Sequence, residues 1–138
     1  MAHTQDVFLI RLTRLQPSQL MINAEKLALW RSRIEAADPF SVSPIPVKRL
    51  DGDRVMMDGH SRGLAAHLSG LDELPVYWET DVLDWDAYRI CVGWCKKAGI
   101  NTIPDLANRV VPPDVYQARW LDRCGRMQRK LAAERRNH

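Results

Sequence analysis

Several features are scarce in this chain, and each absence excludes a class of protein. No apolar run approaches the roughly 18 residues that a membrane-spanning helix needs, so no membrane association is expected. Residues 1–6 have neither the basic start nor the apolar stretch of a signal peptide. Internal repeats and low-complexity segments are also missing from the sequence. We therefore expect a cytoplasmic globular protein.

Cysteine is rare as well, with three residues in the chain. Cys91 and Cys95 lie four residues apart on one face of a predicted helix, and Cys124 is distant in sequence. An odd number argues against a disulfide framework, and the Cys-x-x-Cys spacing of common zinc sites is missing. Two interpretations remain: a three-thiolate metal site, or buried thiols that behave as small hydrophobic groups, which we favour.

The length of 138 residues, with 46% hydrophobic and 27% charged residues, is typical of a soluble domain with a proper core. Turn residues and periodicity predict both strands and helices along the chain. The segment 43–50 contains Pro44 and Pro46, which cannot donate to a ladder, and it is predicted to be an edge strand. Further strands are predicted at 7–12, 54–57 and 74–78, with Asp51-Gly52 as the turn of a hairpin between the strands at 43–50 and 54–57. Helices are predicted from 24, capped by Asn23, and from 60, 85, 103 and 113. Leu121 is expected to be buried in the last helix, and residues 134–138 are expected to fray.

The most informative segment is Asp58-Gly59-His60-Ser61-Arg62, where a predicted strand breaks at glycine and a helix begins. A helix N-terminus presents free backbone N–H groups and the positive end of the helix dipole, which together attract phosphate. Arg62 adds a planar, two-pronged donor for phosphate oxygens. The segment therefore predicts phosphate or nucleotide binding.

Positive charge is concentrated at the C-terminal end. The whole chain carries +3, whereas residues 119–138 contain seven basic and two acidic side chains and so carry +5. A basic strip from Arg119 to Arg136 suits the nucleic-acid backbone. The alternative is a solvated helix end whose cations complement the negative end of the helix dipole.

The order of these elements resembles the ParB/sulfiredoxin superfamily over residues 7–80. The resemblance rests on Pro-Ile-Pro-Val at 44–47, on the loop at 58–62, and on Leu-Pro-Val at 74–76, after Gly70. It implies an α+β fold with a small mixed sheet, made of a ParB/sulfiredoxin-like domain over 7–80 and a C-terminal helical extension over 81–134 packed on it. Members of this superfamily have different activities on the same fold, so we use the sequence of the loop at 58–62 to decide which branch the chain resembles.

The loop is most similar to Asp-Gly-His-x-Arg of the ADP-dependent free-serine kinases. That resemblance implies that Gly59, His60, Ser61 and Arg62 hold nucleotide phosphates. Asp58 would handle Mg²⁺ or the acceptor hydroxyl, with His60 as a second catalytic candidate. The acceptor would be free serine or a similar small hydroxyl compound, and the nucleotide would be ADP, ATP or CTP.

One position departs from the kinase pattern. The kinases resemble Pro-His-Glu in the first loop, where glutamate is the base, whereas this chain has Gln19 after Pro17 and Ser18. Glutamine cannot accept a proton, and the nearest carboxylate, Glu25, falls on the following helix. Loss or change of the kinase activity is therefore part of the hypothesis.

Other branches fit less well. Sulfiredoxins need a cysteine where this chain has His60, so their thiol chemistry is excluded. ParB proteins carry a Gly-Glu-Arg-Arg-like loop, bind CTP and have DNA-binding parts downstream, for which residues 84–134 are short. A DNA-associated module without catalysis, using the basic C-terminal helix, is the alternative function. A nuclease has no supporting cluster of carboxylates.

Plainer structural roles stay open for the residues singled out. Asp58 and Gly59 are also an ordinary turn pair, Ser61 an ordinary helix cap, and His60 a capping or packing residue. We expect His67 to be a partly buried surface residue. The tryptophans are expected to pack within the core rather than stack on bases; they are Trp30, Trp78, Trp85, Trp94 and Trp120.

Overall fold

A four-stranded mixed sheet forms one side of the molecule in the computed structural model, which describes residues 6–137. The strand order is β1-β5-β3-β4, with β3 parallel to β5 and the other two pairings antiparallel. Residues 1–5, on which the signal-peptide prediction mainly rests, lie outside the described part. The strands are β1 (Phe8–Arg11), β3 (Ile45–Leu50), β4 (Asp53–Met56) and β5 (Glu73–Trp78).

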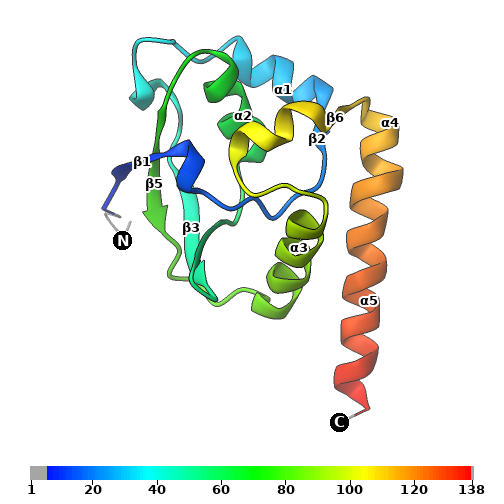
Figure 1. The fold of residues 1–138 in the computed structure, drawn as a ribbon. Helices are drawn as coiled ribbons and strands as arrows, with labels where there is room; N and C mark the ends of the chain where they lie inside the picture. Colours follow the sequence, from blue (N-terminus) through cyan, green and yellow to red (C-terminus); the bar gives the residue numbers. More distant parts are fainter. Residues whose placement is uncertain (1–5, 138) are drawn as a thin grey trace, which may run out of the picture.

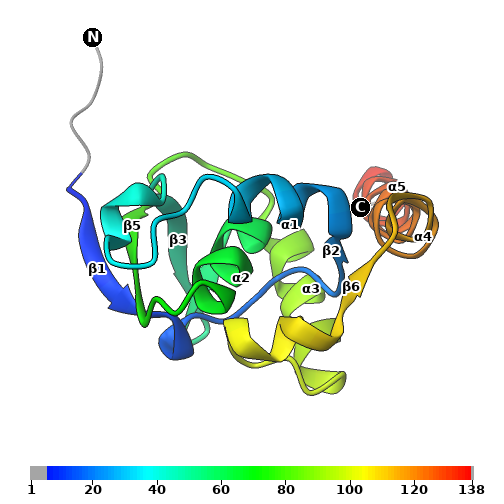
Figure 2. The same cartoon turned by 90° about the horizontal axis from the view of Figure 1, so that it is seen from above.

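Helices cover the sheet, and the last helix lies farthest from it (Figures 1 and 2). A short parallel pair, β2 (Ile22–Asn23) with β6 (Val110–Val111), joins the two halves of the chain. The helical elements are η1 (Leu12–Arg14), α1 (Ala24–Arg31), η2 (Pro39–Ser41), α2 (His60–Leu68), α3 (Trp85–Lys97), η3 (Ile103–Asn108), α4 (Pro113–Tyr116), the π-helical η4 (Gln117–Leu121) and α5 (Asp122–Arg136). The predicted α+β class, with a small mixed sheet and a C-terminal helix, is confirmed.

Local signals account for most element boundaries. Asn23 caps α1 by accepting a hydrogen bond from the Glu25 amide at 2.9 Å, as its side chain predicts. Thr102 and Asp105 form a capping box at the start of η3. The turn residues Asp51 and Gly52 both have positive φ, at 51° and 88°, which suits a two-residue hairpin between β3 and β4.

The prediction that residues 43–50 form an edge strand is wrong, because β3 lies between β5 and β4. Pro46 sits just beyond the last paired residues of the β3–β4 ladder, where the Met57 amide donates to its carbonyl at 3.0 Å. Proline has no backbone N–H, so Pro46 cannot donate the reciprocal hydrogen bond to the Met57 carbonyl. The hydroxyl of Tyr88 donates to the Met57 carbonyl instead, at 3.2 Å, so an interior strand tolerates the proline.

Two smaller expectations also change. The strand β6 interrupts a segment predicted to be helical, because a two-residue strand has no detectable periodicity. Leu121, expected to be buried, is 44% exposed, on a π-helical turn that shifts the helical register. Helix α5 extends to Arg136, and fraying of the last residues stays a prediction. Within residues 6–137 no helix is both long and apolar enough to cross a membrane.

The hydrophobic core has two main parts that draw on both halves of the chain. One lies against the sheet and includes Leu74, Val76 and Ile103, the last contributed by η3. The other includes Leu64 of α2 together with Cys91 and Trp120 from the C-terminal half. His67 is partly buried, as expected, and so are Trp30, Trp85 and Trp94, whereas Trp78 is 39% exposed. The division at residue 80 stays a prediction.

Because Ile103 completes the core beside the sheet, Ile103→Ala should destabilise the whole protein. The side chain is fully buried, and such truncations cost about 2 to 5 kcal/mol. Urea denaturation followed by far-UV circular dichroism should show one transition at a lower midpoint. Val82→Ala, at a residue that is 93% exposed, is the control and should change stability by less than about 0.5 kcal/mol. Two separate transitions would contradict a shared core.

Candidate functional site

The candidate site is built around the first turn of α2. Strand β4 ends at Met56, and Gly59 precedes the helix with φ +79°, a left-handed conformation that favours glycine. The first helical bond of this turn runs from the Gly63 amide to the Gly59 carbonyl at 2.9 Å. The amides of residues 60–62 therefore have no helical partner, and Gly59 supplies no side-chain cap. Ser61, considered as a cap, lies buried inside the helix instead.

The loop after β1 lies against β4 and reaches the start of α2. The Gln16 amide donates to Arg54 O at 2.8 Å, and the Met56 amide donates to Gln16 O at 3.0 Å. The Gln16 side chain is buried and donates to Ile100 O at 2.9 Å. Ser18 Oγ donates to Met56 O at 2.6 Å. These bonds fix residues 16–19 beside the candidate phosphate loop.

His60 connects this loop to the helix. Its Nε2 accepts a hydrogen bond from the Ser18 amide at 2.9 Å, and the residue is 4% exposed. Burial lowers the pKa of His60 from 6.5 to about 4, and the charge of Asp58 opposes this only in part. The ring is therefore neutral at pH 7 with its proton on Nδ1. Any contact between His60 and a phosphate would have to come from that opposite nitrogen.

Arg62 and Asp58 flank the glycine. The Arg62 side chain is 14% exposed and donates to Ser43 O at 3.2 Å, which limits its movement. Its guanidinium lies 5.1 Å from the centre of the Trp30 ring, a cation–π geometry. Asp58 is 81% exposed, with Oδ2 3.9 Å from Arg62 Nη2, so the pair is loose. Arg62 is held in place while Asp58 remains free to bind.

All five predicted loop residues line one cavity of about 310 Å³. That volume lies at the small end of the roughly 300 to 1,000 Å³ typical of small-molecule sites. Lys26 and Trp30 of α1 also line it, four residues apart, and they were not predicted as site residues; their helical spacing beside the loop was the available signal. The other lining residues are Gln19, Leu29 and Tyr116.

The cavity has one carboxylate, Asp58. Gln19 lines the wall, and its Nε2 donates to Met21 O at 2.8 Å. Glu25, considered as a replacement base, is exposed in the first turn of α1 and does not line the cavity. The site therefore offers cations and backbone amides for phosphate but no second carboxylate to act as a base.

The carboxylate, imidazole and thiol side chains determine whether the protein could hold a metal ion at this site. Within residues 6–137 no group of three or more His, Cys, Asp or Glu side chains is arranged to hold one. Mg²⁺ commonly binds through one carboxylate together with substrate phosphates and water. Asp58 fits that requirement only when a phosphorylated ligand supplies the remaining oxygens.

Among the residues that the structure describes, 6–137, the cysteines belong to no group of three or more side chains arranged to hold a metal ion. Cys91 and Cys95 are buried, as expected, and Cys124 is half-buried. A hydrogen bond to Cys124, together with burial, raises the pKa of Cys91, and burial raises that of Cys95 to about 12. Cys91 and Cys95 belong to the second part of the hydrophobic core, together with Leu64 and Trp120, and so serve as packing groups.

Comparison with known proteins gives partial structural similarities. No protein-family model and no curated protein sequence matches the chain. Protein Atu1540 from Agrobacterium tumefaciens superposes with a TM-score of 0.46 and 12% identity, over 72% of this chain and 52% of that one. The C-terminally truncated chromosome-partitioning protein ParB from Caulobacter crescentus, complexed with CTP-γ-S, superposes with a TM-score of 0.45 and 18% identity, over 68% of this chain and 53% of that one. The chain spans about half the length of both, and the branch that its loop resembles stays a prediction.

The buried, neutral His60 predicts a specific pH dependence of stability. Its pKa is about 4 when folded and 6.5 when unfolded, so the unfolded chain binds the extra proton between these values. The stabilisation is therefore complete above pH 6.5 and is lost as the pH falls towards 4. Between pH 7 and pH 4.5 the free energy of unfolding should fall by about 2 kcal/mol more in the wild type than in His60→Gln. Equal losses in urea titrations of both proteins would contradict a buried neutral ring.

Gly59→Ala should be more damaging than its backbone strain alone explains. A Cβ at this position would lie 3.0 Å from both Ile45 Cγ1 and Arg62 Nη2. Gly70→Ala is the matched control, because Gly70 has φ +93° but nothing within 4 Å. Both variants incur about 1 to 2 kcal/mol of left-handed strain, and Gly59→Ala should lose about 1 to 3 kcal/mol more. Equal chemical-denaturation midpoints would show that the loop does not constrain Arg62.

Proposed function

We propose that this chain is a nucleotide-binding domain that holds the phosphate groups of its ligand at the N-terminal end of α2. The observation that carries the proposal is the uncapped first turn of α2, which opens beside the fixed guanidinium of Arg62 in a cavity. Free amides, the helix dipole and an arginine form a combination well suited to phosphate oxygens. The resemblance of residues 58–62 to nucleotide-binding loops points the same way.

The residues divide into three roles under this proposal. The amides of residues 60–62 and the guanidinium of Arg62 bind phosphate oxygens, and Lys26 adds a second positive charge from α1. His60 holds the loop at Ser18 in place rather than reacting. Asp58 binds Mg²⁺ jointly with the phosphates, which is why the metal would be held only with the ligand.

We restrict the proposal to binding, without transfer of a phosphoryl group. Transfer to a serine-like hydroxyl is aided by a base that orients and deprotonates it. Asp58 is the single carboxylate of the cavity, and a metal ion would occupy it. Gln19 takes the position where the similar kinases have glutamate, and an amide cannot accept the proton. Loss of this glutamate base does not alter the arrangement of amides and Arg62 that would bind phosphate.

The proposal predicts that a Mg²⁺-bound nucleotide binds with an affinity that depends on Arg62. Calorimetric titrations with ADP, ATP and CTP should find at least one that binds in the micromolar to millimolar range. Arg62→Ala should weaken that binding by at least about tenfold, since charge-assisted phosphate contacts contribute about 1.5 to 3 kcal/mol each. Thermal unfolding of the variant must first show a folded protein, because Arg62 also donates to Ser43 O.

Arg31→Ala is the matched control, since Arg31 is an exposed arginine of α1 outside the cavity. It should leave the affinity unchanged within about twofold. Binding of none of the three nucleotides at millimolar concentration would reject the proposal. Formation of phosphoserine from a nucleotide and free serine would show instead that transfer survives without the predicted glutamate.

A further inference from the structure

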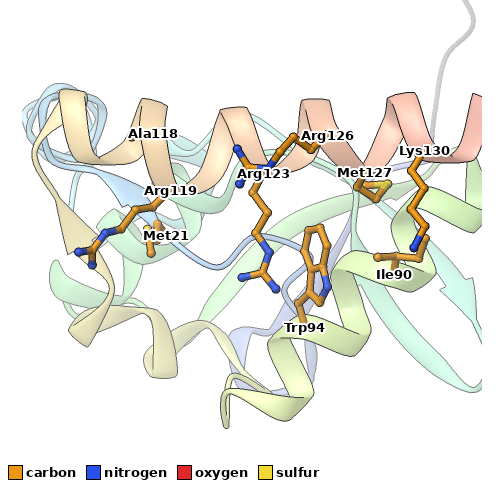
Figure 3. A pocket seen from close by; sticks show the side chains of 9 residues that line it. All are labelled: Met21, Ile90, Trp94, Ala118, Arg119, Arg123, Arg126, Met127 and Lys130. Carbon is orange, nitrogen blue, oxygen red and sulfur yellow. The ribbon is translucent and has the colours of Figure 1, made fainter.

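A second, larger cavity lies between α3 and the C-terminal helix, away from the α2 loop. It has a volume of about 750 Å³, and most of its lining side chains come from the helical segment 118–130 (Figure 3). Four basic side chains line it, and no acidic side chain does. We refer to it as the basic groove, and its lining residues are Met21, Ile90, Trp94, Ala118, Arg119, Arg123, Arg126, Met127 and Lys130.

The four cations are spaced to lie along one face of the helix. Arg119, Arg123, Arg126 and Lys130 follow each other at intervals of four, three and four residues. At a rise of about 1.5 Å per residue they span about 16 Å. None of the four forms an ion pair with any residue between 6 and 137. Their charges are therefore available to an external anion.

The groove is organised before any ligand binds. The Arg123 guanidinium lies 4.0 Å from the centre of the Trp94 ring, in close cation–π contact. Trp94 in turn meets the edge of the buried Trp120 at 6.1 Å between ring centres. Stacking on a ring that is itself supported by the core restricts the guanidinium and lowers the entropy cost of binding.

The helix dipole does not account for these cations. Its effect is confined to the last turn, whereas the groove cations lie well before the end of α5 at Arg136. In the last turn, Arg135 donates to Asp84 Oδ1 at 2.9 Å and lies 3.4 Å from Asp86 Oδ2, which fastens α5 to the start of α3. The basic strip predicted for residues 119–136 therefore divides into four groove cations, the structural anchor Arg135, and two exposed arginines outside the groove, Arg129 and Arg136.

We infer that the basic groove binds the phosphodiester backbone of a nucleic-acid strand. A row of four cations about 16 Å long can contact several phosphates of one strand, whose charges repeat every 3.4 Å along the axis of a duplex. Three of the four cations are arginines, whose planar forks suit phosphate geometry. The one aromatic face that the groove offers, that of Trp94, is covered by Arg123. Met21, Ile90 and Met127 also line the groove and would suit the apolar anchors of an acidic protein segment, so the test below includes that occupant as a competitor.

The test compares two variants that lose the same charge. The groove variant carries Arg119→Gln, Arg123→Gln, Arg126→Gln and Lys130→Gln. The control variant carries Arg14→Gln, Arg31→Gln, Arg129→Gln and Arg136→Gln, four exposed positions outside the groove. A further variant keeps Arg123 and changes the other three groove cations, which are exposed, so that loss of the Trp94 contact cannot unfold it.

Binding is measured by fluorescence anisotropy with labelled single-stranded and duplex DNA of one mixed sequence, from 50 to 200 mM NaCl. The wild type should bind with a log–log salt slope of about −3 to −4, which corresponds to four phosphate contacts. Both groove variants should lose at least about tenfold in affinity and should have a shallower slope. The control variant should stay within about threefold of the wild type.

Three outcomes would overturn the inference. The first is no binding of either DNA at 50 mM NaCl. The second is an equal loss in the groove and control variants, which would mean that net charge alone drives binding. The third is competition by polyglutamate as effective, per charge, as competition by unlabelled DNA, which would assign the groove to an acidic protein segment. The relative affinities for single strand and duplex identify which form supplies the backbone. Because the groove shares no residue with the α2 site, either proposal can fail alone.

Discussion

The contact between His60 Nε2 and the Ser18 amide is the constraint on which the candidate site depends. It joins the first turn of α2 to a loop that is itself bonded to β4 through Met56 O. A charged imidazole could not accept this bond, so burial that keeps the ring neutral is part of the same arrangement. The contact uses a side chain at the start of the helix without capping the helix, and this leaves the amides open towards the cavity.

The sequence predicted those features that local chemistry determines. The cap at Asn23, the hairpin turn at Asp51 and the helix start after Gly59 each follow from one or two residues, and each was found. The place of β3 inside the sheet was mispredicted, because the sequence does not reveal that Tyr88, far along the chain, donates the hydrogen bond to Met57 O that Pro46 cannot make. Long-range compensation of this kind has no local signature.

The same distinction holds for the site. Residues 58–62 line one cavity as expected, since they are consecutive and the glycine turn fixes their geometry. Lys26, Trp30 and Tyr116 were missed as lining residues because only the packing of α1 and α4 beside α2 brings them there. The inward orientation of the His60 side chain could not be predicted from the sequence either, because it depends on residues 16–19 running alongside β4.

The C-terminal helix contributes to both anion-facing surfaces. Tyr116 of α4 lines the α2 cavity, and Arg119, on the π-helical segment that follows, lines the basic groove. The central claim is that phosphate binds at α2, and the most direct test is an amide NMR titration of the protein with Mg²⁺ and ADP, ATP or CTP. Our account predicts that the largest shifts occur at the amides of residues 59–62, saturating together. Shifts confined to residues 119–130, or none in the α2 loop, would contradict it.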